Sequence, residues 1–127
     1  LVVDHLKKRA DFLRAARGIR RVEGAITLET CSTPAAEILP ARLRVGFTAS
    51  KKIGNAVVRN RMKRRFRALA RELLPAQGVA GADHVLIGRE GGIERDFALL
   101  QQELEKALRK IMRVEPSGTR ERRREKS

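Results

Sequence analysis

The sequence contains a single cysteine, no tryptophan and no tyrosine, and these shortages narrow what the protein can be. The lone Cys31 cannot form an intramolecular disulfide. It follows the apolar alternation of Ile26 and Leu28, which predicts a small side chain packed near a core. His5 and His84 lie far apart, and no cysteine and histidine cluster shows the paired spacing of a zinc site. We therefore expect no structural metal.

Long hydrophobic runs are also missing. No apolar run approaches the roughly 20 residues that cross a bilayer, and the first segment, LVVDHLKKR, is too short and too charged for a secretory signal. Binding to an anionic membrane surface needs a helix whose apolar face no protein core requires, whereas this chain needs its apolar faces inside. We expect a cytoplasmic protein without a membrane partner, and 127 residues give room for one domain.

Acidic residues are absent from the middle of the chain. None occurs between Glu37 and Glu72, and the whole chain carries a formal net charge of +14. The basic residues of this interval are Arg42, Arg44, Lys51, Lys52, Arg59, Arg61, Lys63, Arg64, Arg65, Arg67 and Arg71. A phosphate backbone releases condensed counterions when such side chains neutralise it, so a nucleic acid is the predicted partner.

Hydrophobic periodicity predicts an α+β fold. Helices are expected over 8–17, 56–74 and 93–113, strands over 20–30, 42–50 and 83–89, a hairpin loop over 32–40 and a second loop over 75–82. The last residues, PSGTRERRREKS, have no apolar side chains to bury. We therefore expect residues 1–115 to form the domain and residues 116–127 to be a basic disordered tail.

Two of these elements show which face meets the core. Along 42–50, the apolar residues Leu43, Val45, Phe47 and Ala49 share one face, and the opposite face is expected to border a groove open to a ligand. That opposite face carries Arg44, Gly46, Thr48 and Ser50. Along 56–74, one apolar stripe consists of Val58, Met62, Phe66, Leu69 and Leu73.

The helix over 56–74 carries its basic residues away from the apolar stripe. At about 100 degrees per residue, one row contains Arg59, Lys63, Arg67 and Arg71, and the next contains Asn60 and Arg64. Crowded guanidinium groups repel one another unless an anion relieves the repulsion, and their forked donors suit phosphate oxygens. A helix-turn-helix DNA reader needs a short helix just before its recognition helix, where a strand is predicted here. We therefore expect RNA and not DNA as the partner.

Aromatic side chains are too few for recognition based on stacking several bases. Phe66 and Phe97 lie on apolar helix stripes and are predicted to be core residues. Phe12 and Phe47 remain as candidate stacking partners, although core packing is the commoner role of such residues. We expect recognition to depend on backbone charge and shape.

The residues RVGFTASKKIGNAVVRNRMKRRFR, over 44–67, closely resemble the signature of the bacterial ribonuclease P protein subunit, including its RNR motif at Arg59, Asn60 and Arg61. The resemblance extends to LKKRADF, to DHVLIGR and to the last amphipathic helix. It implies a single-domain αβββαβα two-layer sandwich, with a four-stranded mixed sheet packed against helices as in a ribosomal protein domain. It also implies a left-handed βαβ crossover, against the general right-handed preference.

The resemblance further implies a function. Proteins of this family join a large catalytic RNA, and the complex removes the 5′ leader of precursor transfer RNA by hydrolysis that depends on magnesium, bound mainly by the RNA. The residues implied to face the catalytic RNA, with Arg67 included from the same basic row, are Arg59, Asn60, Arg61, Lys63, Arg64 and Arg67. The residues implied to line a leader cleft are Phe12, Thr48, Ser50, Lys51 and Lys52. Ala16 departs from the family pattern, in which many members carry a second aromatic, so leader stacking is expected either to be weaker or to rest on Phe12 alone.

No protein-borne chemistry is expected. Asp11, Glu72, Asp83 and His84 form no sequence pair typical of acid–base or metal–carboxylate sites. The alternative function is a ribosome-associated structural RNA-binding protein of the same fold, which would sediment with ribosomal particles. A protein-only nuclease is a third hypothesis, and it would cleave without any RNA partner.

Overall fold

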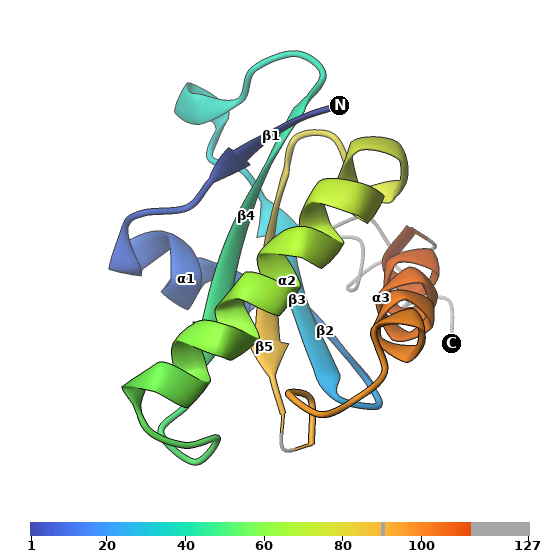
Figure 1. Ribbon diagram of the computed structural model, residues 1–127. Coiled ribbons are helices and arrows are strands. Elements are labelled where there is room, and N and C mark those ends of the chain that lie inside the picture. The colour runs from blue at the N-terminus through green and yellow to red at the C-terminus, as the bar shows by residue number, and fades with distance from the viewer. Residues whose placement is uncertain (90, 113–127) are drawn as a thin grey trace, which may run out of the picture.

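A computed structural model of the chain describes residues 1–89 and 91–112, so the predicted tail at 116–127 lies outside the described residues. The elements are β1 (Val2–His5), α1 (Arg9–Ala16), β2 (Ile19–Glu23), β3 (Ile26–Ser32), η1 (Ala35–Glu37), β4 (Arg42–Ala49), α2 (Ala56–Gln77), β5 (Ala82–Gly88) and α3 (Phe97–Met112) (Figure 1). The fold is mixed α+β, as the sequence predicts. None of the described helices is long and apolar enough to cross a membrane.

One mixed sheet has the strand order β1-β4-β5-β3-β2, with β4 parallel to β1 and β5, and β3 antiparallel to β5 and β2. The strand expected over 20–30 is two strands, because Gly24 takes a φ of +55° and turns the chain back. The expected number of four strands is nevertheless one too few. The fifth is β1, whose four residues are too short to show an alternating pattern.

The segment over 32–40 does not close a hairpin, contrary to the prediction. Strand β5 lies between β3 and β4, and its Val85 pairs with Glu29 on one side and Gly46 on the other. Because β5 is apolar and covered on both faces, the central position of the sheet suits it best. The connection from β3 to β4 instead passes the start of β5, where the Thr33 N–H donates to the Gly81 carbonyl over 2.8 Å.

The crossover from β4 through α2 to β5 is left-handed, as expected. In Figure 1, α2 lies in front of the sheet while β4 and β5 both run down the page, and β5 lies to the right of β4. A right-handed crossover would place β5 on the left. The unusual hand puts the long basic helix over the β1 and β4 side of the sheet.

Helices cover both faces of the sheet, which modifies the expected two-layer arrangement. Helices α2 and α3 bury the main core, whose largest side chain, Phe66, is fully buried as predicted. Helix α1 packs on the opposite face, where Ala15 meets Cys31 and Val85. Burial raises the pKa of the Cys31 thiol to about 11, so this cysteine is an inert packing residue, as predicted.

The long helices differ from their expected bounds at one end each. Helix α2 continues through Pro75 to Gln77, because a proline in the last turn removes only one helical hydrogen bond. It ends where the Gly78 N–H donates to the Leu74 carbonyl over 2.9 Å. Helix α3 begins at Phe97 and not at residue 93, and its first helical hydrogen bond runs from the Leu100 N–H to the Asp96 carbonyl.

Candidate nucleic-acid interface

The basic turn over 51–55 leads directly into α2. The Asn55 side-chain oxygen accepts a hydrogen bond from the Val58 N–H over 3.0 Å and caps the helix. Gly54 has a φ of +153°, and a Cβ added there would lie 2.9 Å from the Val58 side chain. This close approach needs glycine, and it leaves Lys51 and Lys52 exposed beside the first turn of α2.

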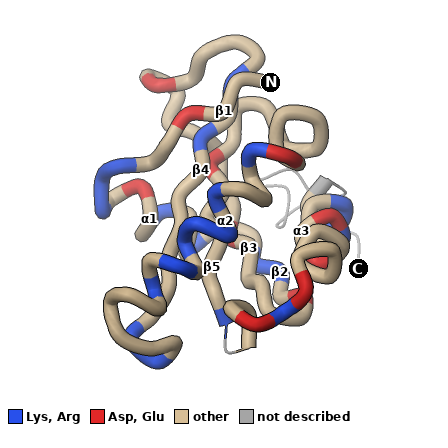
Figure 2. The backbone as a smooth tube through the Cα atoms, viewed as in Figure 1, with Lys and Arg blue, Asp and Glu red and all other residues tan. Residues whose placement is uncertain are grey.

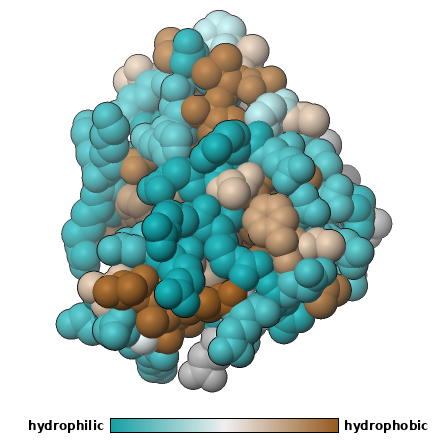
Figure 3. All heavy atoms as spheres, viewed as in Figure 1, coloured by the Kyte–Doolittle hydropathy of each residue, from teal (hydrophilic) through white to brown (hydrophobic). Residues whose placement is uncertain are grey.

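The predicted basic rows lie on the outer surface of α2, opposite the buried stripe. Met62, Phe66 and Leu69 are fully buried, which confirms the orientation of the helix. The outward residues, which we call the basic face, are Arg59, Asn60, Arg61, Lys63, Arg64, Arg67 and Arg71; Arg59 and Lys63 are half-buried and the others are exposed. Figure 2 shows blue segments along most of α2, and Figure 3 shows a hydrophilic band running across the molecule over the same helix.

The described carboxylates do not neutralise the basic face. Within residues 1–89 and 91–112, none of the ion pairs includes a basic residue of α2, Lys51 or Lys52. By contrast, both Lys106 and Lys110 of α3 pair with Glu23 of β2. Within the described part of the chain, the positive charge of the basic face is therefore not compensated by carboxylates.

Arg44 and Arg42 do not contribute to this free charge, although the sequence places both in the acid-free interval. Arg44 donates to both carboxylate oxygens of Asp83, over 2.7 and 2.6 Å, and also contacts Asp11 and Glu37. The hydrogen bonds to Asp83 raise the pKa of the guanidinium above its ordinary value. Arg42 pairs with Asp4 over 3.1 Å. The carboxylates with the shortest contacts to these arginines, Asp83 and Asp4, lie 39 and 38 positions away in the sequence.

Arg65 belongs to α2 but also serves the fold. Its guanidinium donates to the carbonyl oxygens of Ile93 and Arg95 and lies 5.9 Å from the centroid of the Phe97 ring. These contacts bind α2 to the turn before α3. The predicted basic interval therefore supplies fewer free cations than its composition indicates.

A second surface lies on the sheet face that α1 only partly covers. A cavity of about 510 Å³ there is lined by residues that we call the trough: Arg20, Gly24, Thr27, Ser50, Lys52, Ile53, Ile87, Gly88 and Arg89. Of the residues predicted for a leader cleft, Ser50 and Lys52 line this cavity. Arg20, Thr27, Ile87 and Arg89 were not predicted, since they come from three other segments that only the sheet brings together.

Phe12 and Thr48 lie on the same sheet face as the trough, beyond the residues that line it. Phe12 projects from α1 onto β4, where a Cβ added at Gly46 would lie 2.5 Å from its ring. Phe12 and Ile87 both pack against the small core under α1. Thr48 is half-buried two residues after Gly46, whereas Lys51 is exposed in the turn and does not line the cavity. Ala16, in place of an aromatic, is exposed at the end of α1.

The described residues place no metal-binding cluster at these surfaces. Among the described residues, no group of three or more histidine, cysteine, aspartate or glutamate side chains is placed to hold a metal ion. The buried His84 has a structural hydrogen bond, in which its Nε2 accepts from the Val79 N–H over 3.2 Å. Desolvation by burial lowers the pKa of His84 to about 4, which keeps it neutral near pH 7.

Comparison with known proteins agrees with the resemblance seen in the sequence. The family model described as Ribonuclease P matches residues 3–112. The ribonuclease P protein component of Erythrobacter litoralis is 53% identical over 120 residues, covering 94% of each chain. That of Paramagnetospirillum magneticum is 47% identical over 111 residues, covering 86% of this chain and 83% of its own.

Solved structures show the same fold. The RNase P protein of Staphylococcus aureus superposes with a TM-score of 0.66 at 28% identity, covering 83% of this chain and 92% of its own. The RNase P protein of Thermotoga maritima gives a TM-score of 0.67 at 25% identity, covering 85% and 97%. With the family model spanning nearly all described residues, the chain belongs to the ribonuclease P protein family.

Proposed function

We propose that this protein is the protein subunit of ribonuclease P, which assists removal of the 5′ leader from precursor transfer RNA. In this proposal the basic face of α2 binds the catalytic RNA subunit. The trough, together with Phe12 and Thr48, receives the single-stranded leader. The observation that carries the proposal is the basic face itself, a helix surface rich in cations for which the described part of the chain provides no carboxylate partners.

The geometry of the basic face suits a phosphate backbone. Residues four apart on a helix are separated by about 6 Å along the axis, so Arg59, Lys63 and Arg67 form an evenly spaced row of donors. Each contact with a phosphate releases counterions and adds affinity that does not depend on sequence. Asn60, exposed beside this row, adds an amide able to donate to phosphate or sugar oxygens.

The trough suits a single strand because cationic side chains surround a mostly polar lining that also includes the apolar Ile53 and Ile87. Lys52, Arg20 and Arg89 stand at its rim, and the half-buried Ile87 lies on its sheet face. Arg20 is partly engaged, since it donates to Glu29 over 3.1 Å. Lys51, exposed in the adjoining turn, is in this proposal a contact at the mouth and not inside the cavity.

Magnesium enters this proposal through the RNA and not through the protein. The described residues offer no set of carboxylates that fits a magnesium site, and no acid–base pair lies in either surface. We therefore assign hydrolysis and its metal ions to the catalytic RNA. The protein contributes by neutralising phosphates, which otherwise demand high magnesium for the RNA to approach its substrate.

Reconstitution tests the proposal. The purified protein is mixed with catalytic RNA and a precursor transfer RNA at low and at high magnesium, and cleavage is followed with and without protein. Protein alone is expected to leave the precursor uncut, and adding it to the RNA should raise cleavage most at low magnesium. An unchanged cleavage rate, together with sedimentation of the protein on ribosomal particles, would favour the ribosomal alternative. Cleavage by protein alone would favour a protein-only nuclease.

A further inference from the structure

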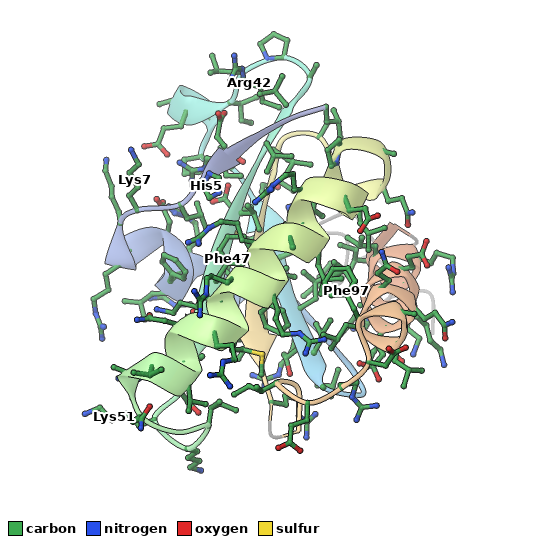
Figure 4. The ribbon with its side chains drawn as sticks, in the orientation of Figure 1. His5, Lys7, Arg42, Phe47, Lys51 and Phe97 are labelled. Carbon is green, nitrogen blue, oxygen red and sulfur yellow. The ribbon has the colours of Figure 1, made fainter. Side chains whose placement is uncertain are left out.

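Phe47 is a half-buried aromatic next to the basic face. Its side chain packs against the main core. The Arg67 guanidinium carbon lies 5.6 Å from the ring centroid, and the exposed His5 ring lies 6.0 Å away with an interplanar angle of 55°. Figure 4 shows His5 and Phe47 on the same side of α2, which is the side that faces β1 and β4.

A small cavity of about 160 Å³ adjoins this cluster. It lies between β1, β4 and α2, and it is lined by Val3, His5, Val45, Phe47, Arg67, Ala70 and Arg71. Aliphatic and aromatic side chains supply most of this lining, while two arginines of the basic face complete it. This cavity is distinct from the trough, which lies on the other face of the sheet.

We propose that this cavity is a base-binding pocket, which receives one unstacked nucleobase of the RNA that the basic face binds. The inference rests on the proposed function, because the RNA backbone must first lie along α2. A base offers a flat π surface, which stacks on Phe47, while the His5 ring, tilted by 55° to Phe47, contacts the edge of the base. Its own phosphate then lies beside Arg67 and Arg71, and the guanidinium of Arg67 adds a cation–π contact.

The charge around the cavity favours a nucleotide, which carries a phosphate, over an uncharged apolar ligand. Its charged lining residues, Arg67 and Arg71, are both cationic, and neither forms an ion pair with a carboxylate in the described part of the chain. An apolar floor bordered only by cations matches a base with an attached phosphate. RNA is also the class of nucleic acid that commonly presents bases turned out of a loop or bulge.

The second arginine and phenylalanine pair of α2 provides a matched control. Arg65 lies over Phe97 at 5.9 Å, a distance close to that between Arg67 and Phe47, and Phe97 is also half-buried. Arg65 is, however, committed to two backbone carbonyls, so this pair closes a contact within the fold. Figure 4 shows Phe97 on the opposite side of α2, next to α3.

The experiment compares Phe47→Leu with Phe97→Leu, each removing one aromatic ring and keeping an apolar side chain. Dissociation constants for the catalytic RNA transcript are measured over a series of salt concentrations, and melting curves confirm that each variant is folded. Phe47→Leu should bind about tenfold more weakly with an unchanged salt dependence, because stacking is lost and phosphate contacts stay. Phe97→Leu should bind within about twofold of the wild type, as expected for a ring outside the interface.

A third variant reports stacking directly. Phe47→Trp keeps a stacking surface and introduces the only tryptophan of the chain, so its fluorescence is free of protein background. It should restore the affinity, and RNA should quench its emission. The pocket is wrong if Phe47→Leu binds like the wild type, or if Phe47→Trp is not quenched.

Further outcomes separate two pairs of explanations. The first pair is a ring that binds a base and a ring that only positions Arg67. The second pair is failure of the pocket and failure of the proposed function. If the slope of log K against log salt for Phe47→Leu falls by the amount of one phosphate contact, the ring only positions Arg67. That result would also overturn the pocket. If the wild-type protein neither binds the catalytic RNA nor raises cleavage, the proposed function itself fails. If Phe47→Leu binds the catalytic RNA with wild-type affinity and stimulates cleavage normally, the base-binding pocket is refuted and the proposed function stands.

Discussion

Replacing Arg59 and Arg61 together by alanine should separate RNA binding from stability. Arg61 is exposed, and the Arg59 side chain makes one long hydrogen bond among the described residues, of 3.4 Å to the Gly54 carbonyl. Neither side chain has a carboxylate partner among the described residues, and neither lies on the buried stripe. Alanine also has the higher helix propensity. The melting temperature should therefore change by no more than a few degrees.

The loss of RNA affinity can be worked out from the number of contacts removed. Each phosphate contact contributes about 0.7 to 0.9 to the slope of log K against log salt concentration, so two contacts should lower the slope by about 1.4 to 1.8. At about 0.1 M salt this corresponds to binding that is weaker by about 25- to 60-fold, or roughly 2 kcal/mol. Fluorescence anisotropy with labelled catalytic RNA, at fixed magnesium and varied monovalent salt, measures both quantities.

The control is a second double variant that has the same net charge as Arg59→Ala with Arg61→Ala. Lys106→Ala with Arg109→Ala removes two cations from α3 and also lowers the formal charge from +14 to +12. If the RNA lies on α2, this control should keep most of the affinity and of the salt slope. Equal losses in both double variants would show that RNA responds to net charge alone. A large drop in melting temperature with unchanged RNA affinity would place Arg59 and Arg61 in the fold.

Three further predictions address the core, the trough side and pH. Phe66→Ala should lower the free energy of unfolding by about 3 to 5 kcal/mol, measured by denaturant titration, because a fully buried ring is lost; a loss below about 1 kcal/mol would contradict this packing. Gly46→Ala should displace the Phe12 ring, since the added Cβ would lie 2.5 Å from it. The affinity ratio of this variant for precursors with a leader over those without one should fall by about tenfold. An unchanged ratio would show that Phe12 is not part of the leader site. His84 has a folded-state pKa of about 4, below the ordinary 6.5, so the unfolded chain takes up the proton first as the pH falls. Stability should therefore decrease between pH 6.5 and 4 by up to about 3 kcal/mol, and this step should be missing from His84→Gln.

The part of the candidate site that lies on one continuous helix was predictable from the sequence. The apolar stripe of α2 fixes which side is buried, and helical geometry then places Arg59, Lys63 and Arg67 outward without knowledge of the rest of the fold. Helix boundaries were predicted less well, since α2 continues past Pro75 and α3 begins at Phe97. Local propensity is weak at such ends, where a few tertiary contacts decide the last turn.

The order and spacing of residues by themselves determined the mixed fold class, the amphipathic helices, the excess of positive charge and the motif that marks the family. The tertiary structure decided which basic side chains are engaged within the fold. Arg44 meets Asp83 39 positions away, and Arg65 meets carbonyls 28 and 30 positions away. It also placed β5 between β3 and β4 and gathered the trough from separate segments. Local periodicity carries no information about such pairings, because they depend on how distant segments pack around a shared core.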